Sequence, residues 1–235
     1  MKFTKMQGLG NDYVYVNCLE SIPENAEKLA VKISDRHFGV GSDGLILICS
    51  SDIADFKMVM YNADGSVSEM CGNGIRCVGK YVRDKGLTDK DEISVETGAG
   101  IKYLKFHREN GETKLITVDM GAPILNGLDI PTVFDKNPVV AEPIKVDGVT
   151  YKTTCVSMGN PHSVVFLDKD TDLKAFDIDG IGSKFESHPA FPRRVNAEFA
   201  KVIKPGLLEM RVYERGTGET LACGTGTCAT HVAAR

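Results

Sequence analysis

Hydrophobic positions along this chain gather in short runs separated by polar and glycine-containing stretches, a pattern that predicts β-strands. β-branched and aromatic runs bounded by Gly, Asp or Asn place strands near Tyr13–Val16, Leu45–Cys49, Phe56–Tyr61, Glu92–Glu96, Ile101–His107, Lys114–Asp119, Pro143–Val146, Lys152–Ser157, Val164–Leu167, Val195–Val202 and Leu207–Tyr213. The pattern therefore predicts a fold in which strands outnumber helices.

A helical period occurs in only a few places. The stretch from Ser21 to Glu24 resembles a capping box, and an apolar stripe follows it. The expected helices cover Ala26–Ile33, a stretch from Asn73 or Gly74 to before Gly86, a stretch after Gly224, and Ile181–Glu186. Few helices among many strands indicate an α+β fold.

The order of these elements repeats along the chain. Cys71 and Cys223 align the two halves without gaps at a constant offset, and each cysteine follows a tyrosine ten residues earlier and precedes a glycine and a helix. Upstream, a Gly-Asn pair at 10–11 resembles the pair at 159–160. The repeat predicts two pseudo-symmetric domains, 1–120 and 121–235, joined near Gly121.

Composition narrows the possible partners. The net charge is -4 and no Lys/Arg run occurs, so neither nucleic acid nor an anionic membrane is an expected partner. The N-terminus lacks the apolar core of a signal peptide, and no apolar stretch is long enough to span a bilayer. The seven cysteines are an odd number, which favours free thiols in a reducing cytoplasm.

Cys71 and Cys223 are candidate reactive thiols. Each precedes the expected start of a helix, whose free N–H groups would lower a thiol pKa from about 8.5 toward neutrality. The same donors could bind a carboxylate. The alternative is a buried structural thiol, which suits the remaining cysteines: Cys18, Cys49, Cys77, Cys155 and Cys228. The cysteine spacings match no zinc pair, so no metal site is expected.

Other polar residues near turns have two interpretations each. His162 and Glu214 could tune a cysteine, or they could be a satisfied turn histidine and half of a surface ion pair with Arg215. Amides and a guanidinium suit an amino acid's ammonium and carboxylate groups, but asparagine is also a common turn former. The residues concerned are Asn11, Asn62, Asn73, Asn160, Asn196 and Arg215. Spacing alone leaves these alternatives open.

Longer motifs resemble those of a known protein family, and this resemblance favours one of the two interpretations. The chain resembles the diaminopimelate epimerase family over essentially its whole length. The similar stretches are MQGLGNDYV at 6–14, GSDGL at 41–45, YNADGSVSEMCGNGIRC at 61–77, VSMGNPH at 156–162, FPRRVN at 191–196 and VYERGTGETLACGTGTC at 212–228. The resemblance implies two domains, each with a mostly antiparallel curled sheet around a long central helix.

The resemblance also implies an activity and a site. The family interconverts LL- and meso-diaminopimelate, a precursor of lysine and peptidoglycan, without pyridoxal phosphate or metal, so no cofactor is expected. Cys71 and Cys223 would be the two catalytic bases, and His162 and Glu214 would tune them. The reacting carboxylate would be bound by Gly72, Asn73, Gly224 and Thr225, and the rest of the substrate by Asn11, Asn62, Asn160, Asn196, Glu214 and Arg215.

Two further expectations complete the sequence reading. A homodimer is the expected assembly, and the last helix reaches Arg235 without a stop signal, which favours a second domain shortened at its C-terminus. The alternatives to diaminopimelate epimerisation are an amino-acid racemase of the proline racemase type and a thiol redox protein that forms a disulfide between Cys71 and Cys223.

Overall fold

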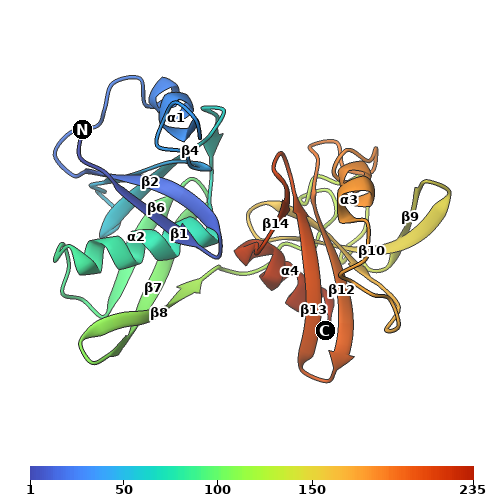
Figure 1. The fold of residues 1–235 in the computed structure, drawn as a ribbon. Coiled ribbons are helices and arrows are strands. Elements are labelled where there is room, and N and C mark those ends of the chain that lie inside the picture. Colours follow the sequence, from blue (N-terminus) through green and yellow to red (C-terminus); the bar gives the residue numbers. More distant parts are fainter. The chain divides into compact units, whose positions relative to one another are not determined.

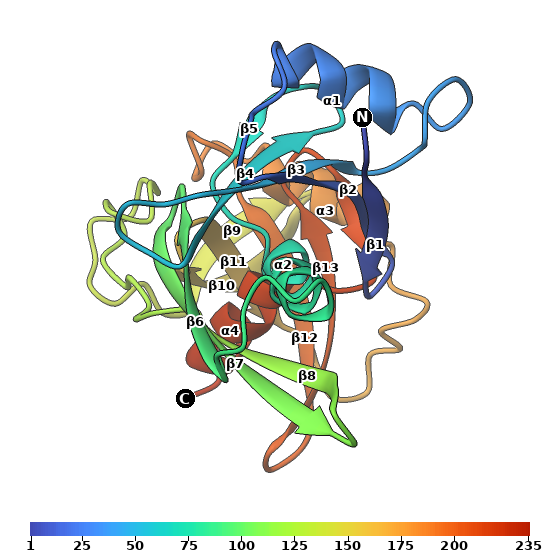
Figure 2. The same ribbon diagram turned by 90° about the vertical axis from the view of Figure 1, so that its left-hand side faces the viewer.

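The computed structural model describes residues 1–235 and divides into two compact units, Met1–Met120 and Gly121–Arg235 (Figure 1). Each unit contains one sheet and two helices. The two sheets are curled and mostly antiparallel (Figure 2), so the predicted α+β class is confirmed. None of the four helices combines the length and apolar character needed to span a bilayer.

The first unit is built on an eight-stranded sheet. Its elements are β1 (Thr4–Gly8), β2 (Asn11–Cys18), α1 (Ala26–Ser34), β3 (Gly44–Cys49), β4 (Phe56–Asn62), β5 (Val67–Ser68), α2 (Gly72–Asp84), β6 (Glu92–Thr97), β7 (Gly100–Glu109) and β8 (Glu112–Asp119). The strand order is β1-β2-β3-β4-β6-β7-β8, and β5 pairs with β4. Only the β2–β3 and β4–β6 pairs are parallel.

The two helices of this unit pack on opposite faces of the sheet. Alternate side chains of β2 point to opposite faces, so Tyr15 packs in one cluster with Ile75 and Val78 of α2. Its neighbour Val14 packs instead with Ala30 of α1. Tyr13–Val16 are apolar on both faces of the strand, and the sheet accordingly carries a helix on each side.

The second unit repeats this plan with six strands. Its elements are β9 (Glu142–Val146), β10 (Val149–Ser157), β11 (Pro161–Phe166), α3 (Ile178–Glu186), β12 (Asn196–Lys204), β13 (Leu207–Glu214), β14 (Gly218–Thr220) and α4 (Gly224–Ala233). The strand order is β14-β13-β12-β11-β10-β9, with β11–β12 the one parallel pair. The core on one face joins Phe185 of α3 to Val165 and Phe199, and α4 packs on β10, β11 and β12.

The strand registers show how closely the two units correspond. In the parallel pair β2–β3, Tyr13 lies opposite Gly44, and in the pair β11–β12, His162 lies opposite Asn196. Helix α2 follows the short strand β5, helix α4 follows the short strand β14, and each helix begins directly after a cysteine. The duplication inferred from sparse sequence identity is thus visible in the pairing of backbones.

The structure corrects some local expectations. The capping box is wrong, because α1 begins only at Ala26 and its N-cap, Asn25, has a left-handed backbone and makes no side-chain cap. Helix α3 begins earlier than expected, since the Asp177 side chain accepts a hydrogen bond from Gly180 N. Strands β5 and β14, of two and three residues, were not predicted because such short segments carry no readable period. The longer strands and the helices after the two cysteines are confirmed within a few residues at their ends.

Candidate active site

Cys71 occupies the N-cap of α2. Its backbone is extended, and its Sγ accepts a hydrogen bond from Gly74 N at 3.3 Å. Gly72 and Asn73 form the buried first turn of the helix. A side chain at Gly74 would place a Cβ 2.8 Å from the Ile46 side chain, so glycine allows the helix start to approach the sheet.

Asn11 holds the Cys71 sulfur from the start of β2. Asn11 Nδ2 donates to Asp43 Oδ2 at 2.7 Å, which fixes the amide so that its oxygen faces the cysteine. Cys71 Sγ donates to that oxygen at 3.2 Å. Asp43 is in turn paired with Arg36 at 2.8 Å. Because an amide oxygen only accepts, Cys71 is a thiol in this arrangement.

The other predicted residues of the first unit divide into two groups. Asn73 lies beside Cys71, and its Oδ1 accepts from Arg76 Nη2 at 2.6 Å, while Arg76 Nη1 donates to Gly72 O. Asn62, at the end of β4, donates to Ser66 Oγ in the following turn instead. The structure therefore joins Asn11 and Asn73 to the cysteine group and leaves Asn62 in a separate turn.

Cys223 has the same place at the N-cap of α4. Its backbone is extended, and Gly226 N donates to its Sγ at 3.4 Å. Thr225 Oγ1 lies 3.3 Å from the sulfur. Cys223 is 5% exposed, and Gly224 and Thr225 form the first turn, so this sulfur is more enclosed than that of Cys71.

A chain of polar side chains leads away from Cys223. Asn160 Nδ2 donates to Thr225 Oγ1 at 3.2 Å, and Asn160 Oδ1 lies 3.0 Å from His162 Nε2. His162 Nδ1 lies 2.7 Å from Glu198 Oε1 on the neighbouring strand β12. Both members of this last pair are fully buried. His162 thus acts neither as a turn histidine nor as a direct partner of the cysteine.

Glu214 and Asn196 lie at the ends of the neighbouring strands β13 and β12. Asn196 Oδ1 accepts from Arg215 N at 2.9 Å, and its Nδ2 donates to Pro161 O at 2.9 Å, so this amide ties two strand ends together. Glu214 Oε1 accepts a hydrogen bond from Thr220 Oγ1. The Arg215 side chain is exposed and donates to Arg193 O.

Burial reverses one expectation about Cys223. The sequence predicts a lowered pKa, but burial and the nearby carboxyl groups of Glu214 and Glu198 raise the pKa of Cys223 well above its usual value. The hydrogen bonds from Thr225 and Gly226 N lower it, but they do not outweigh the loss of hydration. In this arrangement Cys223 is a thiol.

The remaining cysteines are structural. All seven cysteines are free, and Cys18, Cys49, Cys77 and Cys155 are buried while Cys228 is half-buried. Burial raises the pKa of Cys18 to about 11 and that of Cys155 to about 12, so neither is a nucleophile near neutral pH. No group of three or more His, Cys, Asp or Glu side chains is arranged to hold a metal ion.

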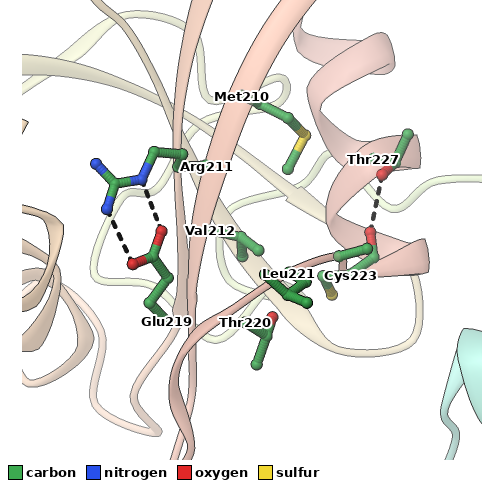
Figure 3. A pocket seen from close by; sticks show the side chains of 9 residues that line it. Met210, Arg211, Val212, Glu219, Thr220, Leu221, Cys223 and Thr227 are labelled. Carbon is green, nitrogen blue, oxygen red and sulfur yellow. Dashed lines mark hydrogen bonds and ion pairs between the residues drawn. The ribbon is translucent and has the colours of Figure 1, made fainter. Parts of the chain in front are cut away.

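A pocket of about 240 Å³ lies beside the Cys223 end of α4 (Figure 3). Its wall includes β13 and β14, with Arg211 paired to Glu219 at 2.6 and 2.9 Å. Thr227 Oγ1 donates to Cys223 O. The charged residues that line the pocket, Arg211 and Glu219, are paired with each other. The pocket therefore offers a ligand fewer hydrogen-bond donors than the first turn of α4 does.

Sequence reasoning missed two carboxyl groups of these networks. Glu198 is a charged residue on an inward-facing position of a strand, among Ala197 and Phe199 in a run that is otherwise apolar. A single charged residue between apolar neighbours was the available signal. Asp43 lies inside the GSDGL motif but had no assigned role, because its contact with Asn11 depends on the pairing of β2 with β3.

Comparison with known proteins identifies the family of this chain. The family model described as diaminopimelate epimerase matches residues 3–125 and 154–235. A diaminopimelate epimerase of Acetivibrio thermocellus is 59% identical over 233 residues, covering 99% of this chain and 82% of that protein. One of Agathobacter rectalis is 55% identical, covering 99% and 83%.

The chain belongs to the diaminopimelate epimerase family. It is accordingly an isomerase of the epimerase type. Among solved structures, a hydroxyproline epimerase from Agrobacterium vitis aligns with a TM-score of 0.66 and 14% identity, covering 99% of this chain and 75% of that one. A phenazine biosynthesis protein of the PhzF family from Enterococcus faecalis aligns with a TM-score of 0.65 and 8% identity, covering 100% and 82%. At these identities the likeness concerns the fold alone.

Proposed function

We propose that this protein interconverts LL- and meso-2,6-diaminopimelate by a two-base reaction in which Cys71 and Cys223 are the acid/base pair. The observation that carries the proposal is the equivalent N-cap position of the two sulfurs, one in each unit. Membership of the diaminopimelate epimerase family supports the substrate. The reaction would supply the meso isomer for lysine and peptidoglycan precursors.

The proposed proton transfers balance in each direction. One cysteine, as thiolate, removes the α-proton and becomes a thiol, while the other, as thiol, gives its proton to the opposite face and becomes a thiolate. The reverse reaction starts from this exchanged state. Both sulfurs must reach the same α-carbon in the working enzyme, so each configuration has its own base.

The two helix starts supply the groups that stabilise the developing carbanion. First-turn N–H groups at Gly72 and Asn73, and at Gly224 and Thr225, are suited to a carboxylate because they lie at the positive end of a helix dipole. Donors placed in a dry site stabilise such charge more strongly than water does. We assign the reacting α-carboxylate to these groups.

The remaining polar residues are assigned two roles: binding the other end of the substrate and tuning the protonation of the cysteines. Asn11, Asn62, Asn160, Asn196, Glu214 and Arg215 are the proposed partners of its ammonium and carboxylate groups. Asn160 keeps a second Nδ2 hydrogen and a second Oδ1 lone pair for a ligand, despite its contacts with Thr225 and His162. His162 and Glu214 are the proposed tuning groups, Glu214 through its negative charge near Cys223 and His162 through its hydrogen bond to Asn160.

Turnover in D₂O tests the scheme. Purified protein in EDTA-containing buffer should convert LL-diaminopimelate to the meso form and place one deuterium at the inverted carbon, as measured by NMR and mass spectrometry. Cys71→Ala and Cys223→Ala should each abolish inversion. Cys77→Ala and Cys228→Ala, further along the same two helices, are matched controls and should retain it. Inversion without solvent deuterium, or inversion by either active-site variant, would refute the two-thiol scheme.

A further inference from the structure

Glu198 is a fully buried carboxyl group that the proposed reaction does not use. It lies on β12 and faces His162 on the neighbouring strand, with Oε1 and Nδ1 separated by 2.7 Å. Its other oxygen, Oε2, has no hydrogen-bond partner. A buried polar atom without a partner is costly, so the residue needs an explanation beyond packing.

The duplicated fold shows that this position does not require a carboxyl group. In the strand pairs, Ile46 lies opposite Tyr15 as Glu198 lies opposite Val164. Both residues touch the glycine that follows the catalytic helix start: a Cβ at Gly74 would lie 2.8 Å from Ile46 Cδ1, and one at Gly226 would lie 2.6 Å from Glu198 Oε1. The first unit therefore builds the same contact with an apolar side chain.

Hydrogen-bond directions connect Glu198 to the Cys223 sulfur. Asn160 Nδ2 donates to Thr225 Oγ1, so its oxygen faces His162 and must accept from Nε2. The Thr225 hydroxyl, having accepted from Asn160, is free to donate to Cys223 Sγ at 3.3 Å. Every bond in this chain then donates toward the sulfur, provided that His162 carries its proton on Nε2.

Glu198 can maintain that tautomer as a neutral acid. When Nε2 carries the proton, Nδ1 of a neutral His162 has no hydrogen. Nδ1 can then accept a hydrogen bond from the protonated Oε1 of Glu198. Burial raises the pKa of Glu198; His162 lowers it in part, and the smaller effect of Glu214 raises it again. An unpartnered Oε2 costs less on a neutral acid than on a carboxylate.

The surrounding charges favour the same protonation state. The titratable groups facing Glu198 are His162 on β11, Glu214 at the end of β13 and Cys223 at the start of α4. A carboxylate at Glu198 would repel both the Glu214 carboxylate and a Cys223 thiolate. A neutral acid removes that repulsion at the moment when Cys223 ionises.

We propose that Glu198 is a positioning residue that acts as a buried carboxylic acid, donating to His162 Nδ1 and so keeping the His162–Asn160–Thr225 chain directed at the Cys223 sulfur. The role rests on the proposed function, because it matters only if Cys223 exchanges protons with a substrate. No proton leaves Glu198 during turnover.

Two substitutions separate this role from that of a buried charge. Glu198→Gln keeps the shape and an N–H donor for Nδ1 but can never be a carboxylate. Glu198→Met keeps the approximate volume and removes the donor, and the presence of Ile46 at the equivalent position indicates that the fold accepts an apolar residue. Glu142→Gln, in the partly buried ion pair with Lys136 near the far edge of the same sheet, is the matched control.

The measurements are kcat and KM with diaminopimelate, the pH profile of kcat/KM, the melting temperature, and ¹⁵N NMR of the His162 ring. We expect Glu198→Gln to stay within about threefold of wild type and to keep the Nε2–H tautomer. Glu198→Met should lower kcat by about tenfold to hundredfold, the scale of the Thr225 hydrogen bond to a charged Cys223 thiolate that the chain would no longer align, and it should move the Cys223 limb of the profile to higher pH. KM should change little and the control should behave as wild type.

Three results would overturn the proposal. The first is a loss of kcat in Glu198→Gln as large as that in Glu198→Met. The second is a Glu198→Met variant whose kcat and pH profile equal those of the wild type. The third is a His162 ring that is doubly protonated in the wild type at neutral pH. A wild-type protein that does not turn over diaminopimelate would contradict the proposed function instead. The ¹⁵N spectra would still decide the protonation of the Glu198–His162 pair, because they require folded protein and no turnover.

Discussion

Thr225 is the closest side-chain partner of the Cys223 sulfur, and its replacement tests the chemistry at that helix start. In Thr225→Val the side chain keeps its shape and loses the hydroxyl group. Two hydrogen bonds disappear, the 3.3 Å contact with Cys223 Sγ and the 3.2 Å contact from Asn160 Nδ2. At about 0.5–1.5 kcal/mol each, the free energy of unfolding should fall by about 1–3 kcal/mol.

The effect on catalysis should exceed the effect on folding. The hydroxyl donates to a thiolate during turnover, and a hydrogen bond to a charged group contributes about 1.5–3 kcal/mol, or about tenfold to hundredfold in rate. Since Thr225 lowers the pKa of Cys223 against the larger effect of burial, its loss raises that pKa further. The limb of kcat/KM that requires the Cys223 thiolate should therefore move to higher pH.

The assay compares Thr225→Val with Thr225→Ser, which keeps the hydroxyl and loses only a methyl group. Urea denaturation gives the free energies of unfolding, and initial rates across pH give the profiles. Thr225→Ser should keep the wild-type profile. Equal rates and superimposable pH profiles for the two variants would refute the argument, because the hydroxyl would then contribute nothing to Cys223.

Three further predictions follow from the same contacts. Gly182→Ala should lower the free energy of unfolding by about 1–3 kcal/mol in urea denaturation, because its new Cβ would lie 2.6 Å from the Cβ of Tyr213 on β13. An unchanged midpoint would contradict this packing. Cys155→Ala should lose less stability at alkaline pH than the wild type does. Burial raises the pKa of Cys155 to about 12, so the thiol contributes fully below its unfolded pKa near 9 and loses that contribution as pH rises toward 12. Equal slopes of melting temperature against alkaline pH for variant and wild type would show that the thiol is not buried. Asp43→Ala should lower kcat/KM about tenfold by releasing the Asn11 amide, and wild-type kinetics would show that Asn11 needs no such support.

Local patterns in the sequence predicted most of the elements because their causes are local. A short run of apolar residues marked β3, whose six residues are all buried, and glycine followed by an apolar stripe marked α2 and α4. The predicted capping box failed because the chain enters α1 through Asn25 in a left-handed conformation, without a side-chain cap. Strands β5 and β14 depend on pairing with a neighbour rather than on their own two or three residues.

The candidate site was less predictable from the sequence, because its groups meet through strand pairing. His162 and Glu198 are distant in sequence, and the parallel pairing of β11 with β12 brings them within 2.7 Å. Asn11 meets Asp43 in the same way through β2 and β3. The motifs identified the first member of each pair, while the second came only from the register of the sheets.

The amino-acid sequence by itself determined that two cysteines occupy equivalent helix starts, since both the glycine context and the repeat are written in neighbouring residues. The tertiary structure decided how those two positions differ. Cys71 is half-buried and bonded to an amide that leads to the exposed Arg36, whereas Cys223 is enclosed beside the buried Glu198. The reason is physical: loss of hydration and the distances between charges set the pKa of a thiol, and both depend on the residues that folding brings around it.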